Sequence, residues 1–191
     1  MSDELLLERA KGGDQAAFEE LYERHRNAVF GFAYRLLGSV ETAEDVTHDC
    51  FLSLIRRPDG FAASRAGLRT YLYGAARNLA LKYFRNAGRA DALDELTMEP
   101  PVPVREQPLN RVLDEELSQK VQEAVTSLPP LQREAIVLFE YEGLALSEIA
   151  DIVGSDVGAV KARLHRARER LRSTLRPYLN SALEIATLER P

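Results

Sequence analysis

The sequence contains a single cysteine, Cys50, and no tryptophan. One cysteine cannot form an internal disulfide, and without a second thiol no cysteine-based zinc site can be built. The three histidines, His25, His48 and His165, are far apart and do not have metal-ligand spacing. No apolar run approaches the roughly 20 residues needed to span a bilayer, and no signal peptide is recognisable. These absences predict a cytoplasmic protein with no membrane insertion and no bound metal.

The sequence also lacks the common catalytic motifs. It has no phosphate-binding glycine loop, no nucleophile elbow and no HExxH pair. The run His48-Asp49-Cys50 contains reactive residue types, but neighbours on one helix point in different directions. A buried cysteine between two polar residues is the simpler interpretation. We therefore expect no enzyme activity and no cofactor.

Charge is distributed unevenly along the chain, whose net charge is −5. Residues 56–90 contain eight Lys or Arg and one acid, a net +7, and residues 161–176 contain seven and one, a net +6. The rest of the chain therefore carries −18. Two cationic segments on an acidic chain indicate two contacts with a polyanion, and nucleic acid is the first candidate. Surface helices can also be rich in arginine because they are solvated, so charge alone leaves DNA binding open.

Apolar periodicity predicts helices in the first half of the chain. A short helix over 3–11 precedes one over 15–37, which Asp14 caps and Gly38 ends. Ser39 is placed to cap a third helix that reaches about residue 56. A fourth helix is expected over 68–86. Its predicted apolar stripe consists of Leu68, Leu72, Ala75, Ala76, Leu79 and Tyr83.

The other faces of this fourth helix mix basic and aromatic residues. They carry Arg69, Tyr73, Arg77, Asn78, Lys82 and Arg85. Single-stranded nucleic acid is bound by such a mixture, because cations meet phosphates and flat rings stack on bases. The alternative is that the aromatic rings belong to the core. Tyr71 and Tyr73 cannot both point the same way as Leu72, so we expect at least one of the two rings to be exposed.

Residues 91–108 contain four prolines and five acids, which predicts an extended acidic linker. The expected organisation is all-α, with two small helical domains joined by this proline-rich segment. We place the first domain at 1–90, the linker at 91–109, the second domain at 110–180 and a tail at 181–191.

The second domain is expected to end in a helix-turn-helix. A helix over about 110–127 is followed by one that begins at Pro129-Pro130 and ends at Gly143. Gly154 then allows a turn between two further helices, and Ser155 is placed to cap the second. The face of that helix opposite its apolar stripe carries Lys161, Ala162, His165 and Arg166. These residues lie in its N-terminal half, the part that enters a major groove in helix-turn-helix proteins.

Three segments together resemble the extracytoplasmic-function sigma factors, the smallest two-domain class of the sigma-70 family. They are GDQAAFEELYERHRNAVFGFAYRLLGSVETAEDVTHDCFLSLIRR, LRTYLYGAARNLALKYFRN and LPPLQREAIVLFEYEGLALSEIADIVGSDVGAVKARLHRARERL. The resemblance covers nearly all of the chain outside the linker. Each segment alone is moderately specific, whereas their order and spacing are highly specific.

The resemblance implies three groups of contact residues. Candidate contacts to RNA polymerase are Asp45, Asp49, Phe51 and Leu52. Candidate contacts to the −10 element, which this class opens and reads, are Phe61, Arg69, Tyr73, Arg77, Asn78 and Lys82. Candidate contacts to the −35 element are Lys161, Ala162, His165, Arg166 and Arg168.

The chain departs from the family pattern at the start of the helix-turn-helix. Ala145 stands where many relatives have serine, which removes half of a capping box with Glu148. This loss should cost about 1 kcal/mol, unless the helix begins later, at Ser147.

The implied function is that of an alternative sigma factor, which binds bacterial core RNA polymerase and directs initiation at promoter DNA. An anti-sigma factor is a further implied partner. Two other functions are compatible with parts of the pattern. A free-standing helix-turn-helix regulator would not need the second basic helix, and it would bind duplex DNA without polymerase. A sigma mimic that sequesters an anti-sigma factor could lack both basic faces, which this chain retains.

Overall fold

The computed structural model describes residues 1–56, 67–86 and 109–188, and for residues 86, 109–116 and 179–188 it describes the backbone only. Every regular element in these ranges is a helix, which confirms the all-α prediction. The predicted linker 91–108 and the candidate −10 residue Phe61 lie outside the described residues.

The N-terminal part consists of α1 (Asp3–Lys11), α2 (Gln15–Leu37), α3 (Val40–Arg56) and α4 (Leu68–Asn86). The predicted caps are confirmed. Asp14 accepts a hydrogen bond from the backbone N–H of Ala17 at 3.1 Å, and Ser39 accepts one from Thr42 at 3.3 Å. Gly38 ends α2 in the left-handed conformation, with φ of 73°. These local signals fix where α2 and α3 begin and end.

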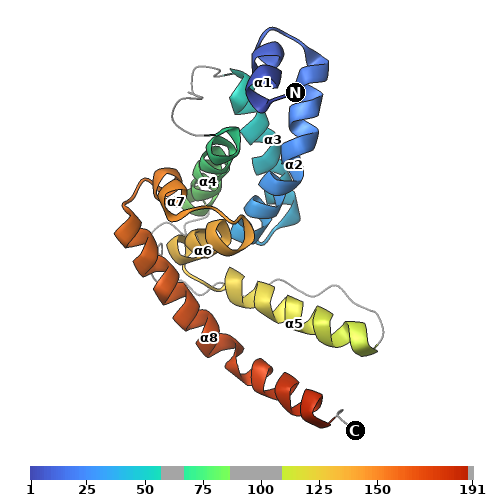
Figure 1. Ribbon diagram of the computed structural model, residues 1–191, viewed down its shortest axis with the longest axis vertical. Helices are drawn as coiled ribbons and strands as arrows, with labels where there is room; N and C mark the ends of the chain where they lie inside the picture. Colours follow the sequence, from blue (N-terminus) through green and yellow to red (C-terminus); the bar gives the residue numbers. More distant parts are fainter. Residues whose placement is uncertain (57–66, 87–108, 189–191) are drawn as a thin grey trace.

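The core of the N-terminal part lies between α2, α3 and α4, with α1 packed against α2 (Figure 1). Its most buried side chains include Leu21, Phe32, Val46 and Leu54. The predicted stripe of α4 is wrong in part. Tyr83 is 36% exposed, whereas four residues outside the predicted stripe are buried: Thr70, Tyr73, Ala80 and Phe84. The buried arc is wider than expected because α4 packs on α2 and α3 and also contacts α7.

The C-terminal part consists of α5 (Leu109–Thr126), α6 (Pro130–Ile136), a π-helical turn η3 (Val137–Tyr141), α7 (Leu146–Val153) and α8 (Val157–Leu188). The turn between α7 and α8 is made at Gly154, with φ of 64°, as predicted. The predicted cap of α8 is wrong. Asp156, and not Ser155, accepts a hydrogen bond from the backbone N–H of Ala159, at 2.9 Å.

The helix α7 begins at Leu146 and retains half of a capping box. The backbone N–H of Ala145 donates to the Glu148 carboxylate at 2.8 Å. Ala145 has no side-chain oxygen, so the reciprocal bond that a serine would make at this position cannot form. The helix therefore does not start later, at Ser147, as one expectation allowed.

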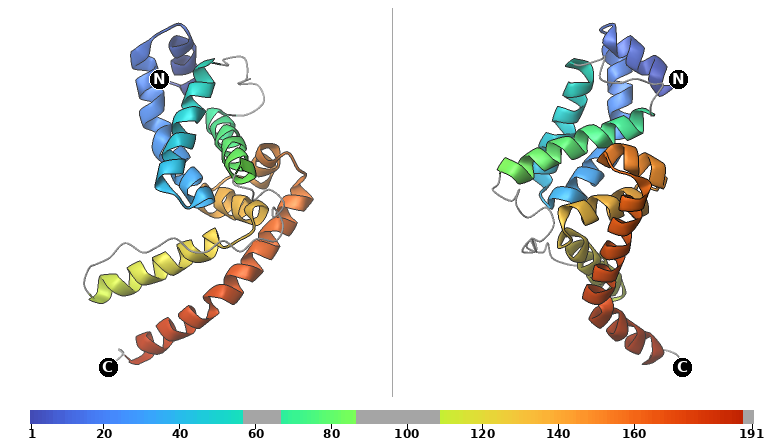
Figure 2. Two further views of the ribbon diagram at one scale, coloured as in Figure 1. Left: turned by 180° about the vertical axis from the view of Figure 1, so that it is seen from behind. Right: turned by 90° about the vertical axis from the view of Figure 1, so that its left-hand side faces the viewer.

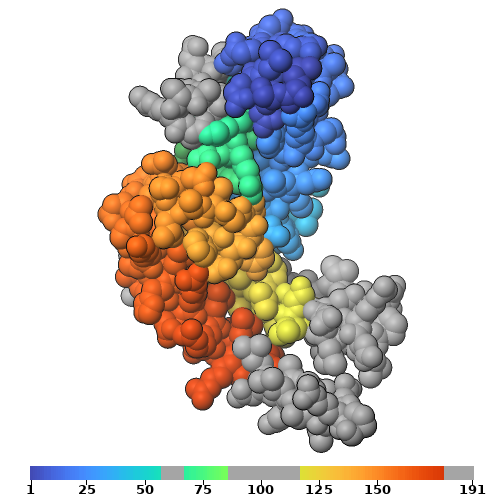
Figure 3. Space-filling view, viewed as in Figure 1, coloured from blue at the N-terminus to red at the C-terminus, as the bar shows by residue number. Residues whose placement is uncertain are grey.

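The two parts of the chain pack against each other. Helix α4 contacts α7, and α2 contacts α5, α6 and η3. Their buried apolar residues form one contiguous cluster that runs from α1 to α8. Two further views show α6 and α7 lying against α4 and the end of α2, while α5 and α8 diverge away from the N-terminal part (Figure 2). In the space-filling view α7 lies directly against α4, and α8 continues away from it (Figure 3).

Arg133 of α6 joins the two parts from inside. Its guanidinium is buried and donates to the backbone carbonyls of Leu36, Thr126 and Leu128, the last at 2.9 Å. Leu36 and Thr126 lie at the C-terminal ends of α2 and α5, where carbonyls lack intrahelical partners and the helix dipole favours a cation. Burial lowers the pKa of Arg133 to about 10, which still leaves it charged at neutral pH.

Candidate nucleic-acid interface

The first candidate surface is the N-terminal half of α8. Its inner stripe, Val160, Leu164 and Ala167, is buried. The remaining faces of this half carry four of the predicted −35 residues, and all four are exposed: Lys161, Ala162, His165 and Arg166. Helix α8 runs along the outer edge of the C-terminal part (Figure 1). These four residues therefore lie together on an accessible basic surface of α8, the second helix of the helix-turn-helix.

Arg168, the fifth predicted −35 residue, is exposed but held in place. Its guanidinium pairs with Glu140 at 2.7 Å and lies over the ring of Phe139, with 5.1 Å to the ring centroid. Both partners belong to η3, so Arg168 also ties α8 to the helix beneath it. A surface ion pair of this kind contributes little to stability but orients the guanidinium.

The second candidate surface is the face of α4 that carries Arg77. This guanidinium binds the Glu134 carboxylate of α6 through two bonds, from Nε at 2.7 Å and from Nη2 at 3.2 Å. The same carboxylate accepts from Arg163 of α8 at 3.3 Å. Burial raises the pKa of Glu134, against the opposing effect of the two arginines. One buried carboxylate thus holds an arginine from each part of the chain.

A second buried carboxylate, that of Glu142, meets α4 one and two turns earlier. It accepts a short hydrogen bond from the Tyr73 hydroxyl. Arg69 donates to the backbone carbonyl of Glu142 at 2.7 Å, and Arg35 of α2 lies 3.9 Å from its carboxylate. The guanidinium of Arg35 also covers the ring of Tyr141, at 4.5 Å from the centroid. Burial, with the neighbouring carboxylate of Glu142, raises the pKa of Tyr73 to about 12.

The five predicted −10 residues that the structure describes occupy different environments. Asn78 and Lys82 are exposed, and Arg69 is half-exposed. Arg77 is largely covered, and Tyr73 is fully buried. The expectation that Tyr71 or Tyr73 is exposed is wrong, because Tyr71 is partly buried against the core. A stacking role for Tyr73 on a base is not available in this arrangement of the two parts.

The candidate polymerase contacts on α3 also differ in their exposure. Asp45 and Asp49 are exposed, and Leu52 is partly buried. Phe51 is 2% exposed, and its ring packs edge-on against Tyr22 at 4.9 Å between centroids. Phe51 thus supports α3 from inside in this arrangement, and its contact to polymerase stays a prediction.

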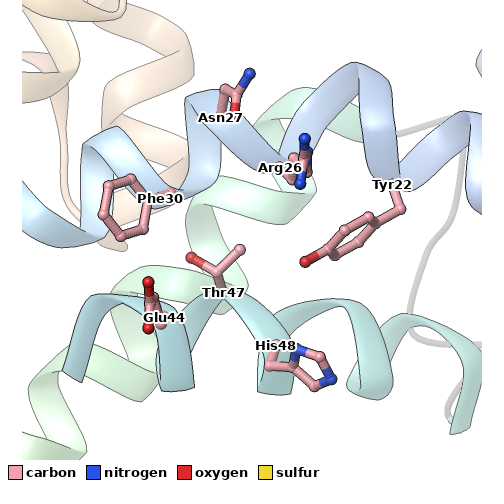
Figure 4. A pocket seen from close by; sticks show the side chains of 7 residues that line it. All are labelled: Tyr22, Arg26, Asn27, Phe30, Glu44, Thr47 and His48. Atoms are coloured by element: carbon pink, nitrogen blue, oxygen red, sulfur yellow. The ribbon is translucent and has the colours of Figure 1, made fainter. Parts of the chain in front are cut away.

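A groove of about 370 Å³ lies between α2 and α3 (Figure 4). Its lining residues are Tyr22, Arg26, Asn27 and Phe30 from α2 and Glu44, Thr47 and His48 from α3. The described part of the chain contains no group of three or more His, Cys, Asp or Glu that could hold a metal ion. Cys50 is buried, and burial raises its thiol pKa to about 12, so it is not an activated nucleophile.

Sequence reasoning missed the residues that cover α4. Glu134 and Glu142 lie 57 and 69 residues from their partners Arg77 and Tyr73. No spacing rule links residues so far apart. The one available signal was the placement of Arg133 and Glu134 between the apolar residues Leu131 and Ala135 of α6, since charged residues are rarely buried without partners.

These observations define an all-α protein with a helix-turn-helix and a second basic helix. The Sigma-70 region 2 family matches residues 21–90, and the Sigma-70, region 4 family matches residues 118–171. The chain is 34% identical over 178 residues to the ECF RNA polymerase sigma factor SigW of Bacillus subtilis, across 89% of this chain and 95% of that protein. It is 35% identical over 187 residues to the ECF RNA polymerase sigma-E factor of Escherichia coli, across 94% and 97%.

Two solved structures have a fold similar to that of this chain. The sigma factor RpoE in complex with the anti-sigma factor NepR from Bartonella quintana superposes with a TM-score of 0.65 at 27% identity, over 83% of this chain and 96% of that one. CnrH in complex with the cytosolic domain of CnrY shares the fold, with a TM-score of 0.59 at 24% identity over 92% and 97%. The chain belongs to the ECF sigma factors, alternative RNA polymerase sigma factors that direct transcription initiation. Sigma factors are transcription regulators and not catalysts. The part of the chain that the structure describes contains no helix with the length and apolar composition of a membrane span.

Proposed function

We propose that this sigma factor reads the −35 element with the exposed face of α8. The observation that carries this assignment is the grouping of Lys161, Ala162, His165 and Arg166 on one accessible surface at the start of the second helix of the helix-turn-helix. Lys161 and Arg166 supply charge for phosphates or guanine edges, and the small Ala162 lets the helix approach the bases. His165 offers a ring nitrogen to a base edge.

The −35 assignment is tested with Arg166→Ala in the reconstituted holoenzyme. The variant should weaken promoter binding by about 1–3 kcal/mol, because a basic contact to DNA is lost. Arg176→Ala is the matched control, since Arg176 is exposed on the same helix but about 15 Å further along its axis. Equal losses in the two variants, or an unchanged footprint for Arg166→Ala, would contradict the assignment.

The N-terminal part is assigned to the −10 element. Asn78 and Lys82 lie exposed on α4, one helical turn apart, and an amide can read a base edge while an ammonium meets phosphate. Arg69, Tyr73 and Arg77 on the adjoining face would complete this surface once it is uncovered. Phe61, in the segment that precedes α4, is a further candidate.

The −10 assignment predicts that Asn78→Ala impairs initiation on a duplex promoter more than on a pre-melted one. Equal losses on the two templates would remove the strand-opening role.

Docking on core RNA polymerase is assigned to α3. Asp45 and Asp49 present two carboxylates one turn apart, Leu52 adds apolar surface, and the groove between α2 and α3 lies on the same helix. Asp45→Ala/Asp49→Ala should weaken binding to core polymerase. Glu41→Ala is the control, because Glu41 is an exposed acid in the first turn of the same helix. Equal core binding by the double variant and the control would show that the docking surface lies elsewhere.

The proposed partners are bacterial core RNA polymerase, promoter DNA and an anti-sigma factor, in the cytoplasm, and we propose that the chain itself catalyses no reaction. The anti-sigma partner is supported by a solved relative, the sigma factor RpoE, whose structure is a complex with the anti-sigma factor NepR. Run-off transcription with bacterial core polymerase on a genomic promoter library tests the whole proposal. Failure to obtain a promoter-specific product with any compatible core would reject it.

A further inference from the structure

The part of the proposed −10 surface that consists of Arg69, Tyr73 and Arg77 is covered by two carboxylates from the C-terminal part of the same chain. Glu134 and Glu142 have side chains only 2% and 7% exposed, and each contacts a predicted −10 residue. Glu134 binds Arg77, whereas Glu142 accepts from Tyr73 and lies beside Arg69. The contacts therefore follow one face of α4 over two turns.

We infer that Glu134 and Glu142 hold the free chain closed, with their carboxylates bound where DNA phosphates bind when the two parts separate. The inference rests on the proposed −10 role of α4. It assigns an autoinhibitory function to two residues outside both DNA-reading surfaces. In the closed chain the exposed face of α8 can still contact DNA, whereas the face of α4 that carries Tyr73 and Arg77 cannot.

The geometry of the contacts supports substitution of carboxylate for phosphate. Arg77 approaches Glu134 with two N–H groups, at 2.7 and 3.2 Å, and the planar guanidinium fork recognises carboxylates and phosphates in this same two-bond manner. The hydroxyl of Tyr73 and the guanidinium of Arg69 are also common phosphate donors. All three donors thus bind an anionic oxygen or a carbonyl from within the chain.

The polarity of the contact favours a reversible interface over a permanent one. Buried ion pairs cost desolvation, and apolar residues at the same positions often stabilise a fold as well or better. When the two parts separate, Glu134, Glu142 and their partners regain water, so the charged half of the interface opens at lower cost than an apolar surface would. Arg35 extends the charged half onto α2, through its contacts to Glu142 and Tyr141.

The test uses the full-length chain without polymerase. Glu134→Gln/Glu142→Gln removes both negative charges and preserves side-chain shape. Glu19→Gln/Glu23→Gln is the matched control, because both of its glutamates are exposed on α2 away from the interface. Small-angle X-ray scattering measures the radius of gyration. Fluorescence anisotropy measures the affinity for a short labelled single-stranded oligonucleotide at low salt.

The Glu134→Gln/Glu142→Gln variant should have a larger radius of gyration than the native chain. It should also bind the oligonucleotide between about 5-fold and 150-fold more tightly, the usual range for coupling between two sites. The control double variant should match the native chain in both measurements. An unchanged radius of gyration and an unchanged affinity in the Glu134→Gln/Glu142→Gln variant would overturn the inference. Expansion without a gain in affinity would also overturn it, since the carboxylates would then not be masking DNA contacts.

A second variant covers the case in which the double substitution prevents folding, as judged by circular dichroism. Arg35→Gln weakens the same contact from α2 and leaves both carboxylates in place. Arg35→Gln should expand the chain and raise its affinity for the oligonucleotide by a smaller factor, and no change in either would count against the closed state.

Promoter opening by the Asn78→Ala holoenzyme distinguishes failure of the closed state from failure of the proposed function. If Asn78→Ala impairs opening while the glutamate and Arg35 variants behave as the native chain does, the inference fails and the proposed function stands. If Asn78→Ala has no effect on opening, the proposed function itself fails.

Discussion

The two basic helices of this sigma factor, α4 and α8, differ in what surrounds their charges. On α8, Lys161, His165 and Arg166 face solvent. On α4, Arg77 is bound by a carboxylate, and Tyr73 is buried against another. The sequence segments that contain these helices, 56–90 and 161–176, are near equals in net charge, +7 and +6. The difference teaches that the charge of a segment does not determine its availability, which depends on the long-range partners that the fold brings to it.

The largest effect is expected in the core beneath the covered helix. Phe32→Ala removes a fully buried ring that lies 5.1 Å from the ring of Tyr73, and it should cost about 3–5 kcal/mol of unfolding free energy. Urea denaturation followed by circular dichroism measures this loss. Phe30→Ala, at a partly buried ring on the same helix, should cost clearly less. Equal losses of unfolding free energy in the two variants would mean that the ring of Phe32 beneath α4 contributes no more to stability than the partly buried ring of Phe30.

The next effect concerns the residue that joins the two parts. Arg133→Met should cost about 3 kcal/mol, because three backbone carbonyls, two of them at helix ends, lose their donor while the apolar volume is kept. Arg176→Met, at an exposed position on α8, should leave stability nearly unchanged. A loss below about 1 kcal/mol for Arg133→Met would show that water replaces the guanidinium at these carbonyls.

Two glutamates only two residues apart compare the covered and open sides directly. Glu142 faces α4 and is 7% exposed, whereas Glu140 pairs with Arg168 and is 49% exposed. Glu142→Ala should cost about 1–3 kcal/mol, because Tyr73 loses its acceptor in a buried site. Glu140→Ala should cost no more than about 1 kcal/mol, as for other surface pairs. Chemical denaturation of the two variants gives both values, and the reverse order would break the comparison.

The smallest effect is expected at the start of the open helix. Asp156→Ala removes the side chain that caps α8 and should cost about 1 kcal/mol. Ser155→Ala should be nearly neutral, since Asp156 makes the capping bond. Thermal melting followed by circular dichroism compares the two variants. A larger loss in Ser155→Ala would restore the sequence-based assignment of the cap.

Much of the fold follows from short-range signals in the sequence. Asp14, Gly38 and Ser39 set the ends of α2 and α3, and each acts on backbone groups within four residues. The exposed face of α8 follows from helical periodicity alone. The docking of α6 and α7 on α4 could not be predicted in this way. It depends on the pairs Arg77–Glu134 and Tyr73–Glu142, which no periodicity relates. Tyr73 and Phe84 meet the C-terminal part at this docking, through Glu142 and Arg133.

The carboxylates that cover α4 belong to the same polypeptide as the residues they cover. The balance between covered and uncovered forms is therefore a first-order property, independent of protein concentration, and dilution cannot release α4 as it would release a bound inhibitor. A partner can change that balance only by its preference for one form. Moving the population from one part in a hundred uncovered to one part in a hundred covered requires about 10⁴-fold tighter binding to the uncovered form. Core polymerase and promoter DNA together would have to supply this preference, so the threshold for initiation would be set by Glu134 and Glu142 as well as by the promoter sequence.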